Sequence, residues 1–385
     1  MTVTQIKDLM NEVTREVLGE ENLVNENLSN VVDIGTQIFN SSSVDNYVKS
    51  LVNHIGRVIF VNRVYRGSAP SVLMDGWEFG SVLEKITADL PEATDNESWE
   101  LENNTSYDPN IFYKPTVSVK FYNSKVTFEI PCSFTEKQVK QSFSNSTQLN
   151  AFLSMLYNAV EKSLTVKIDS LIMRTINNFI SETIYSDYGS ANLNSKSGIR
   201  AINLLYLYNN KFNKSLTANN CIFDKDFLRY AAYVMTTTKS RLAKISKRYN
   251  IGGRDRFTPE DFLHVVLLAD FAQGANIYLQ SDTFHNDFVK LPNAEIVSQW
   301  QGSGTASDEY PTNSTINVTN SAGHTVNTSG ILGVMFDRDA LGVCNIDRRV
   351  TTNYNPKAEF YTNWYKFDAG YFNDFNENFV VFFVA

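Results

Sequence analysis

The stretch TQLNAFLSMLYNAVEKSLTVKIDSLIMRTINNFISETI, residues 147–184, decides the fold. Its apolar side chains recur at steps of three, four and seven residues, which place them on one face of an α-helix. They are Leu149, Phe152, Leu153, Leu156, Val160, Leu164, Ile168, Leu171, Ile172, Ile176, Phe179 and Ile180. No Gly or Pro interrupts the run, and Gly189 follows it as a terminator. The pattern therefore predicts one helix over 147–184, about 55 Å long, with a bend at Thr165 and Val166 left open.

The residues before this helix predict an N-terminal arm and an extended excursion. Helical spacing between Ile6 and Val17 indicates a short amphipathic helix within residues 1–40. The stretch 44–65 begins with helical spacing and ends in a β-branched run typical of a strand. Residues 66–116 are polar, acidic and broken by Gly and Pro, so they suit an extended loop better than a core. The alternation in residues 117–130 predicts a strand pair that brings the chain back.

The residues after the long helix mix helical and strand patterns. Residues 198–212 and 224–249 have helical spacing, whereas the apolar run 263–268 is short and favours a buried strand. Residues 302–330 are rich in Gly, Ser, Thr and Asn, which predicts a long surface loop or a hairpin. The closing run FVVFFV, residues 379–384, would aggregate if it formed an exposed edge, so it must be covered in the core. Together these patterns predict the α+β class.

Composition excludes several functional classes. The chain has 385 residues, 43% of them hydrophobic and 13% aromatic, enough for a packed core. Its net charge is −8 and no block of Lys or Arg stands out, which argues against a dedicated nucleic-acid reader. No segment resembles a signal peptide or reaches the length of a membrane span. Cys132, Cys221 and Cys344 lie far apart, so we expect small, partly buried thiols and neither disulfides nor a zinc site.

Local motifs for catalysis are weak. The four His residues lack metal-ligand spacing, and His264 is interpreted as a satisfied, half-buried core residue. Residues 249–254 contain two glycines, but they predict a turn rather than a nucleotide loop. Asp337, Arg338 and Asp339 mimic a metal-binding triplet, yet their setting favours a connection between a strand and a turn. We therefore predict no enzyme and no catalytic, cofactor-binding or metal-binding residues.

The order of these features resembles the major capsid proteins of tailed phages, whose fold is named after the Hong Kong ninety-seven phage. Within that group the chain is similar to the capsid proteins of short-tailed, phi twenty-nine-like phages of Gram-positive hosts. The resemblance runs from about residue 30 to the end. The stretches that carry it are VDNYVKSLVNHIGRVIF (44–60), WEFGSVLEKITADL (77–90), the helix at 149–172, FLHVVLLADF (262–271), NIYLQSDTFHNDF (276–288), KLPNAEIV (290–297), ILGVMFDRDALGV (331–343) and the passage from Thr351 to Phe382.

The resemblance implies a division into named regions. Residues 1–40 would form the N-terminal arm, and residues 66–120 the E-loop that reaches over a neighbouring subunit. The P-domain would combine residues 41–65, 121–190 and 350–385 around the spine helix at 147–184. The A-domain would comprise residues 191–349, with 302–330 as an exposed loop.

The resemblance also implies a function. The chain would self-assemble, as hexamers and pentamers, into an icosahedral head shell around double-stranded DNA that it does not bind sequence-specifically. It would be made in the cytoplasm of the host bacterium and reside in the virion, with no cofactor and no membrane contact. Scaffolding, portal and head-fibre proteins are further candidate partners.

Charged residues within the excursion and just before it are candidates for ion pairs between subunits. These are Arg57, Arg63, Arg66, Glu84, Lys85 and Asp89. Three alternatives stay open at this stage: the shell of an encapsulin-like compartment, another phage structural protein such as a portal, and a phage-associated glycoside hydrolase with paired carboxylates.

Overall fold

The computed structural model of the chain describes residues 3–18, 24–25, 29–40, 47, 50–51, 69–74, 83–88, 103, 110, 112, 114, 117–135, 137–138, 141, 146–280, 294–301, 313–320 and 323–385. Two compact units share these residues. The first comprises Met1–Glu78, Lys125–Ile172 and Val343–Gly370. The second comprises Phe79–Ser124, Met173–Gly342 and Tyr371–Ala385. Each unit is described by itself below.

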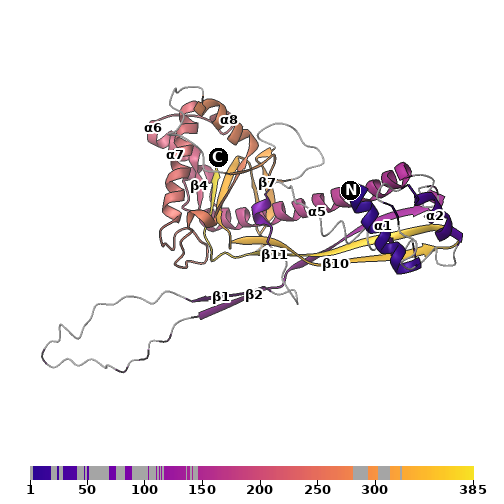
Figure 1. The fold of residues 1–385 in the computed structure, drawn as a ribbon. Helices are drawn as coiled ribbons and strands as arrows, with labels where there is room; N and C mark the ends of the chain where they lie inside the picture. Colours follow the sequence, from indigo (N-terminus) through magenta and orange to yellow (C-terminus); the bar gives the residue numbers. More distant parts are fainter. Residues whose placement is uncertain are drawn as a thin grey trace. The chain divides into compact units, whose positions relative to one another are not determined.

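The predicted long helix is confirmed as α5, Ser146–Tyr188, which is 43 residues long (Figure 1). It runs without a break through Thr165, whose hydroxyl donates to the Glu161 carbonyl within the helix at 2.9 Å. Gly189 ends it with a left-handed φ of 58° and donates its N–H to the Tyr185 carbonyl at 2.7 Å. Residues up to Ile172 belong to the first unit, and those from Met173 belong to the second.

The first unit is built on a three-stranded sheet in the order β10–β11–β3. Its strands are β3 (Lys125–Thr135), β10 (Leu341–Asn355) and β11 (Phe360–Asn373). β11 pairs antiparallel with β3, from Phe360 opposite Thr135 to Gly370 opposite Lys125. Side chains alternate between the two faces of a strand, and the buried face of this sheet meets α5 through Phe134 and Phe152, whose ring centroids are 5.7 Å apart.

The N-terminal residues of the first unit form two helices and are packed into its core. The predicted amphipathic helix is confirmed as α1 (Val3–Leu18), and α2 (Val31–Asn40) follows it. Met10 and Val13 of α1 are fully buried, and the Tyr47 hydroxyl donates to the Met10 sulfur at 3.8 Å. A short turn, η1 (Pro70–Val72), leads to Met74, whose N–H bonds to the Val343 carbonyl.

The second unit is built on a five-stranded sheet in the order β4–β12–β9–β5–β6. These strands are β4 (Ala201–Asn203), β5 (Leu263–Leu268), β6 (Glu295–Val297), β9 (Ile331–Asp337) and β12 (Phe379–Phe383). The apolar end of the chain is β12, which pairs parallel with β4 and antiparallel with β9. All five of its residues are buried, so the predicted covering of this segment is confirmed, as is the predicted strand at 263–268.

Three helices accompany this sheet: α6 (Leu204–Phe212), α7 (Lys225–Leu242) and α8 (Ala269–Gln280). Figure 1 shows them grouped beside the strands of the second unit. Single-turn helices η3 (Leu193–Ser195), η4 (Cys221–Phe223) and η5 (Glu260–Phe262) lie in the connections. Asp224 caps α7 by accepting a hydrogen bond from the Phe227 N–H at 2.7 Å.

Two predicted helices are too long, for identifiable reasons. The helix expected over 198–212 begins only at Leu204, because the three residues before it pair with β12 as β4. The helix expected over 224–249 ends at Leu242, and Ser246 instead forms an antiparallel bridge with Arg256. In the first case pairing with a distant strand overrides a local helical pattern, and in the second a short antiparallel bridge within residues 246–256 does.

Within 302–330 the structure describes residues 313–320 and 323–330, and the predicted hairpin is confirmed there. Its strands are β7 (Ile316–Thr319) and β8 (Thr325–Thr328), paired antiparallel. Full exposure is not observed for the described part, since Ser314 and Ile316 are buried. The Ser181 hydroxyl of α5 also donates to the Val318 carbonyl at 3.3 Å.

The strands expected over 117–130 exist, but they do not pair with each other. Strand β2 (Val117–Tyr122) pairs with β1 (Leu83–Ala88), whereas β3 pairs with β11. The predicted boundaries of the N-terminal arm, E-loop, P-domain and A-domain stay predictions. The strand expected over 57–65 lies outside the described residues, as does most of the helix expected before it.

Two glycines with the same backbone conformation give a matched test of the core of the second unit. Gly323 and Gly330 both have φ of 82°, which costs an L-residue about 1–2 kcal/mol. A Cβ at Gly323 would meet open space, whereas at Gly330 it would collide with the Val384 carbonyl oxygen. In urea unfolding of the purified chain, we expect Gly330→Ala to lower the free energy of unfolding by about 1–3 kcal/mol more than Gly323→Ala does. Equal losses would contradict this packing.

Candidate assembly surface

The β1–β2 hairpin has two faces of opposite chemical character. Its register runs from Leu83 opposite Tyr122 to Ala88 opposite Val117. The inner, half-buried face carries Leu83, Lys85, Thr87, Ser118, Lys120 and Tyr122, and the outer, exposed face carries Glu84, Ile86, Ala88, Val117, Val119 and Phe121. The usual distribution is therefore inverted, since most of the polar groups point inward and most of the apolar groups point to solvent.

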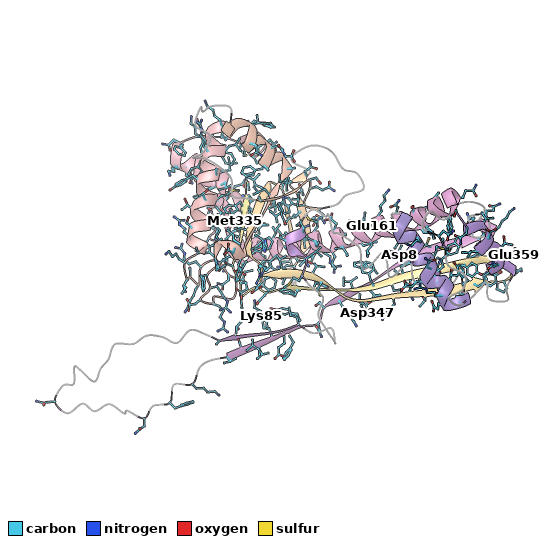
Figure 2. All side chains as sticks on the ribbon, viewed as in Figure 1. Asp8, Lys85, Glu161, Met335, Asp347 and Glu359 are labelled. Atoms are coloured by element: carbon cyan, nitrogen blue, oxygen red, sulfur yellow. The ribbon has the colours of Figure 1, made fainter. Side chains whose placement is uncertain are left out.

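Ion pairs hold the inner face to the rest of the second unit. Lys85 Nζ lies 2.8 Å from Asp374 Oδ2 and 2.8 Å from Glu377 Oε1, and Figure 2 marks Lys85 on the hairpin. Lys120 Nζ lies 2.8 Å from Asp374 Oδ1, and Arg256 Nε lies 3.1 Å from Glu377 Oε1. We call these five residues the ion-pair cluster.

Both carboxylates of the ion-pair cluster come from one turn, residues 374–378, between β11 and β12. The Asp374 N–H bonds to the Ala340 carbonyl at 2.6 Å, and its side chain accepts from the Asn376 N–H at 3.1 Å. The Glu377 N–H bonds back to the Asp374 carbonyl at 3.1 Å. Because backbone bonds fix the turn, the two carboxylates are held in position for the hairpin's ammonium groups.

The pKa values of the cluster follow from this pairing. Burial alone would raise the pKa of Asp374, but hydrogen bonds from Lys120 and Lys85 outweigh it and hold that pKa below its usual value. Burial alone would lower the pKa of Lys85, but Asp374 and Glu377 hold it above its usual value. Burial, with the negative charge of Asp374, also raises the pKa of Tyr122 on the same face. Asp374 and Lys85 are therefore both charged throughout the neutral range.

The outer face presents an apolar stripe to solvent. Ile86 and Val119 are opposite each other in the register, and Ile86 and Phe121 are each 64% exposed. Val117 and Val119 continue the stripe along β2 and are also exposed. Adjacent exposed apolar groups on an anchored element are typical of a surface that another molecule covers.

The structure describes two of the six residues predicted to form ion pairs between subunits. Glu84 lies exposed on the outer face, next to the apolar stripe. Lys85 lies on the inner face and is already paired within its own chain through Asp374 and Glu377. Arg57, Arg63, Arg66 and Asp89 lie outside the described residues. A role of these six residues between subunits stays a prediction.

Sequence reasoning missed the acidic half of the ion-pair cluster. Asp374 and Glu377 sit in a polar turn just before the apolar end of the chain, a setting that gives no sign of their partners. Lys85 and Glu377 are 292 residues apart in sequence. One signal was available: Lys85, Thr87, Ser118 and Lys120 alternate with apolar residues along both strands.

The segments that resemble catalytic motifs form turns and strand ends. Arg338 and Asp339 lie in the turn after β9, and Asp337 ends that strand, as predicted. Residues 249–254 form the predicted turn, in which Asn250 bonds to both backbone groups of Arg254. Cys132, Cys221 and Cys344 form no disulfide, and Cys221 and Cys344 are buried. His264 is half-buried as predicted, but its Nε2 finds no hydrogen-bond partner in the described part, and burial lowers its pKa.

Within the described ranges, no group of three or more His, Cys, Asp or Glu side chains is arranged to hold a metal ion. The described helices also include none long and apolar enough to cross a membrane.

Comparisons with known proteins identify the family and the fold. Residues 10–383 match the family of Phi29-like phage major capsid proteins. A chain in the capsid structure of Staphylococcus phage Andhra has a TM-score of 0.51 at 13% identity, with 84% of this chain and 86% of that chain covered. A chain in the structure of head fiber and inner core protein gp22 of native bacteriophage P68 has a TM-score of 0.50 at 11% identity, with the same coverage. No curated protein matches the sequence. The predicted α+β fold of the Hong Kong ninety-seven type is confirmed.

Removing the central charge of the cluster should loosen the hairpin. Lys85→Met leaves Asp374 paired with Lys120 and Glu377 paired with Arg256. We therefore expect the free energy of unfolding to fall by less than the about 3–5 kcal/mol that a fully broken buried ion pair costs. Hydrogen exchange of residues 83–88 and 117–122 should accelerate. Glu84→Gln, on the outer face of the same strand, is the control and should leave exchange unchanged. Equal acceleration in both variants would contradict the anchoring role.

The same anchoring should depend on pH at both extremes. The folded-state pKa of Asp374 is lowered, so its carboxylate stabilises the anchored hairpin above about pH 4. This stabilisation is lost as pH falls below that value. The folded-state pKa of Lys85 is raised, so its contribution is present below about pH 10 and is lost as pH rises further. Hairpin exchange, corrected for the intrinsic rate, should be flat from about pH 5 to 9. A step within that window would contradict this assignment.

Proposed function

The chain belongs to the family of Phi29-like phage major capsid proteins, and we propose that the apolar stripe of the β1–β2 hairpin joins its copies into the icosahedral shell that encloses the viral double-stranded DNA. The family match over residues 10–383 and the capsid fold make the chain a phage capsid shell protein, which resides in the virion.

The observation that carries the proposal is the inverted hairpin. Its inner face is fixed by the ion-pair cluster, while Ile86, Val117, Val119 and Phe121 remain exposed. A two-stranded hairpin has unpaired backbone groups along both outer edges as well, and such edges accept strands from other chains. Covering the stripe with a second copy would remove apolar area from water at about 25 cal/mol per Å².

A shell needs each contact to be only moderately strong. Every subunit in a closed lattice contacts several others, so weak contacts are multiplied through effective concentration. We infer that the copies form hexamers and pentamers, and that scaffolding, portal and head-fibre proteins meet the shell as further partners. The net charge of −8 favours enclosing the DNA without binding it tightly.

The remaining sequence-based hypotheses fit this proposal. Residues 66–120 would be the E-loop, of which the structure describes the two strands β1 and β2. Glu84 emerges beside the apolar stripe, where its carboxylate would face a cation of the neighbouring copy, and Arg57, Arg63, Arg66 and Asp89 would supply further ion pairs. We infer a structural role rather than an enzymatic one, because the family is one of capsid proteins.

Polar substitutions in the stripe should block assembly without unfolding the subunit. The triple variant Ile86→Thr, Val119→Thr and Phe121→Thr keeps residues that strands tolerate, and it leaves the ion-pair cluster intact. We expect particle yield in sedimentation and electron microscopy to fall about tenfold or more, since each ~1.4 kcal/mol lost per contact is a factor of ten. Circular dichroism of the soluble protein should be unchanged.

A control with the same chemistry separates this effect from a general loss of apolar surface. Ile245 is 59% exposed, close to the value for Ile86, but it is not on the hairpin. Ile245→Thr should assemble at normal yield. Normal yield of the triple variant, or an equal loss in the control, would overturn the assignment of the stripe while leaving the family assignment intact.

A further inference from the structure

Four polar side chains lie together on the buried face of the three-stranded sheet in the first unit. Asn363 of β11 is directly opposite Cys132 of β3, and Tyr365 follows Asn363 on the same face of β11. Thr352 lies on β10. We call Cys132, Thr352, Asn363 and Tyr365 the polar row.

The place of Thr352 in this row follows from the hairpin between β10 and β11. Residues 356–359 form the turn that joins these neighbouring strands. Tyr354 and Tyr361, equally far from the turn, have ring centroids 4.7 Å apart. Thr352 and Asn363 are each two residues further along their strands. Because side chains alternate between faces, these two residues face each other on the same side as the tyrosines.

Four hydrogen-bonding atoms of the row, on Thr352, Asn363 and Tyr365, have no partner within the described residues. Asn363 and Tyr365 are fully buried. Neither the amide oxygen nor the amide nitrogen of Asn363 has a hydrogen-bond partner there, and the buried hydroxyls of Tyr365 and Thr352 have none either. Buried polar groups are nearly always paired, so four such atoms at neighbouring positions of one sheet face need hydrogen-bond partners that the described side chains do not supply.

The opposite face of the same strands shows no such deficit. The hydroxyls of Ser133 and Thr362 lie 3.1 Å apart, and the Thr127 hydroxyl donates to Asp368 at 2.6 Å. Lys366 and Glu129 form an ion pair at 3.2 Å. The register between β11 and β3 is continuous through these positions, so the unpaired groups of the row do not reflect poor pairing of the sheet.

The chemistry of the row selects a small neutral ligand. It offers an amide oxygen, an amide N–H₂ and two hydroxyls, a mixture of donors and acceptors without a carboxylate or a cation. Burial raises the pKa of the Cys132 thiol, which keeps the sulfur neutral and unsuited to bind a metal. A water molecule makes two to four hydrogen bonds with groups of this kind in protein interiors.

We propose that the polar row binds ordered water, which bridges the Asn363 amide to the hydroxyls of Tyr365 and Thr352. The water sits between the sheet and the first half of α5, because the row shares its face with Phe134, the residue that contacts Phe152 of the helix. It fixes the rotamers of Asn363 and Tyr365 and so holds the three strands in one arrangement under the helix. This site is independent of the apolar stripe and of its role in assembly.

A structure of the assembled particle that resolves water tests the proposal directly. We expect density at about 2.7–3.2 Å from an Asn363 amide atom and from the Tyr365 hydroxyl. A protein atom from this chain or a neighbouring copy that occupies those positions would overturn the proposal, and so would an empty site.

Thermal unfolding of the purified chain gives a second test, in which the sign of the effect decides. If water bridges the row, Tyr365→Phe and Asn363→Leu each remove one of its partners, and each should lower Tm by about 2–4 °C. The double variant should lose less than the sum, because both changes break the same bridge. If the row were dry, each substitution would remove an unpaired buried group, and Tm would rise additively.

Thr362→Val is the matched control for these variants. It lies between Asn363 and Tyr361 on β11, but its hydroxyl is on the exposed face with Ser133. It should change Tm by less than either variant of the row. If one of these variants does not fold, the water density in a structure of the unsubstituted particle still decides the question.

Discussion

Burial of the apolar face of α5 is the constraint on which both units depend. In the first unit Leu153, Leu156 and Leu164 of this helix are buried, and in the second unit Ile176, Phe179 and Ile180 are buried. Phe179 stacks on Phe379 of β12 with ring centroids 4.0 Å apart, so the helix and the end of the chain share one core. A 43-residue helix is far longer than an average helix of about 11–12 residues, and packing on these side chains maintains it more than helix propensity does.

The core of the second unit in turn fixes the position of the β1–β2 hairpin. β12 lies between β4 and β9, and the turn before it carries Asp374 and Glu377. Backbone bonds from this turn to Ala340 and within the turn hold both carboxylates where the hairpin can reach them. The apolar end of the chain therefore does more than close the core, because it also positions the charges that anchor β1 and β2.

The sequence predicts those parts of the fold whose signal is local. Each of three features has its signal within one continuous segment: the helical spacing of apolar residues in α5, the apolar end of the chain, and the hairpin between Ile316 and Thr328. Pairing between distant segments has no such local signal, so the sequence predicts helix where β4 forms and predicts pairing between β2 and β3. The ion-pair cluster is the extreme case, since its anion–cation partners lie 121–292 residues apart. The order of the segments along the chain carries the resemblance to the capsid family, and this order is preserved even where single boundaries are wrong.

The inverted hairpin shows how a subunit can carry an apolar contact surface without hiding it in its own core. An apolar inner face would hold the hairpin just as well, but apolar groups on both faces would give no preference for which face is buried. Lys85 and Lys120 remove that ambiguity, because only one face can satisfy Asp374 and Glu377. Isolated two-stranded hairpins are marginally stable, so the ion pairs both orient the β1–β2 hairpin and stabilise it on the second unit. The stripe of Ile86, Val119 and Phe121 thereby stays exposed to solvent, as the proposed contact between copies requires. The alternation of charged and apolar residues along β1 and β2 is the pattern to seek in sequences that lack a catalytic motif.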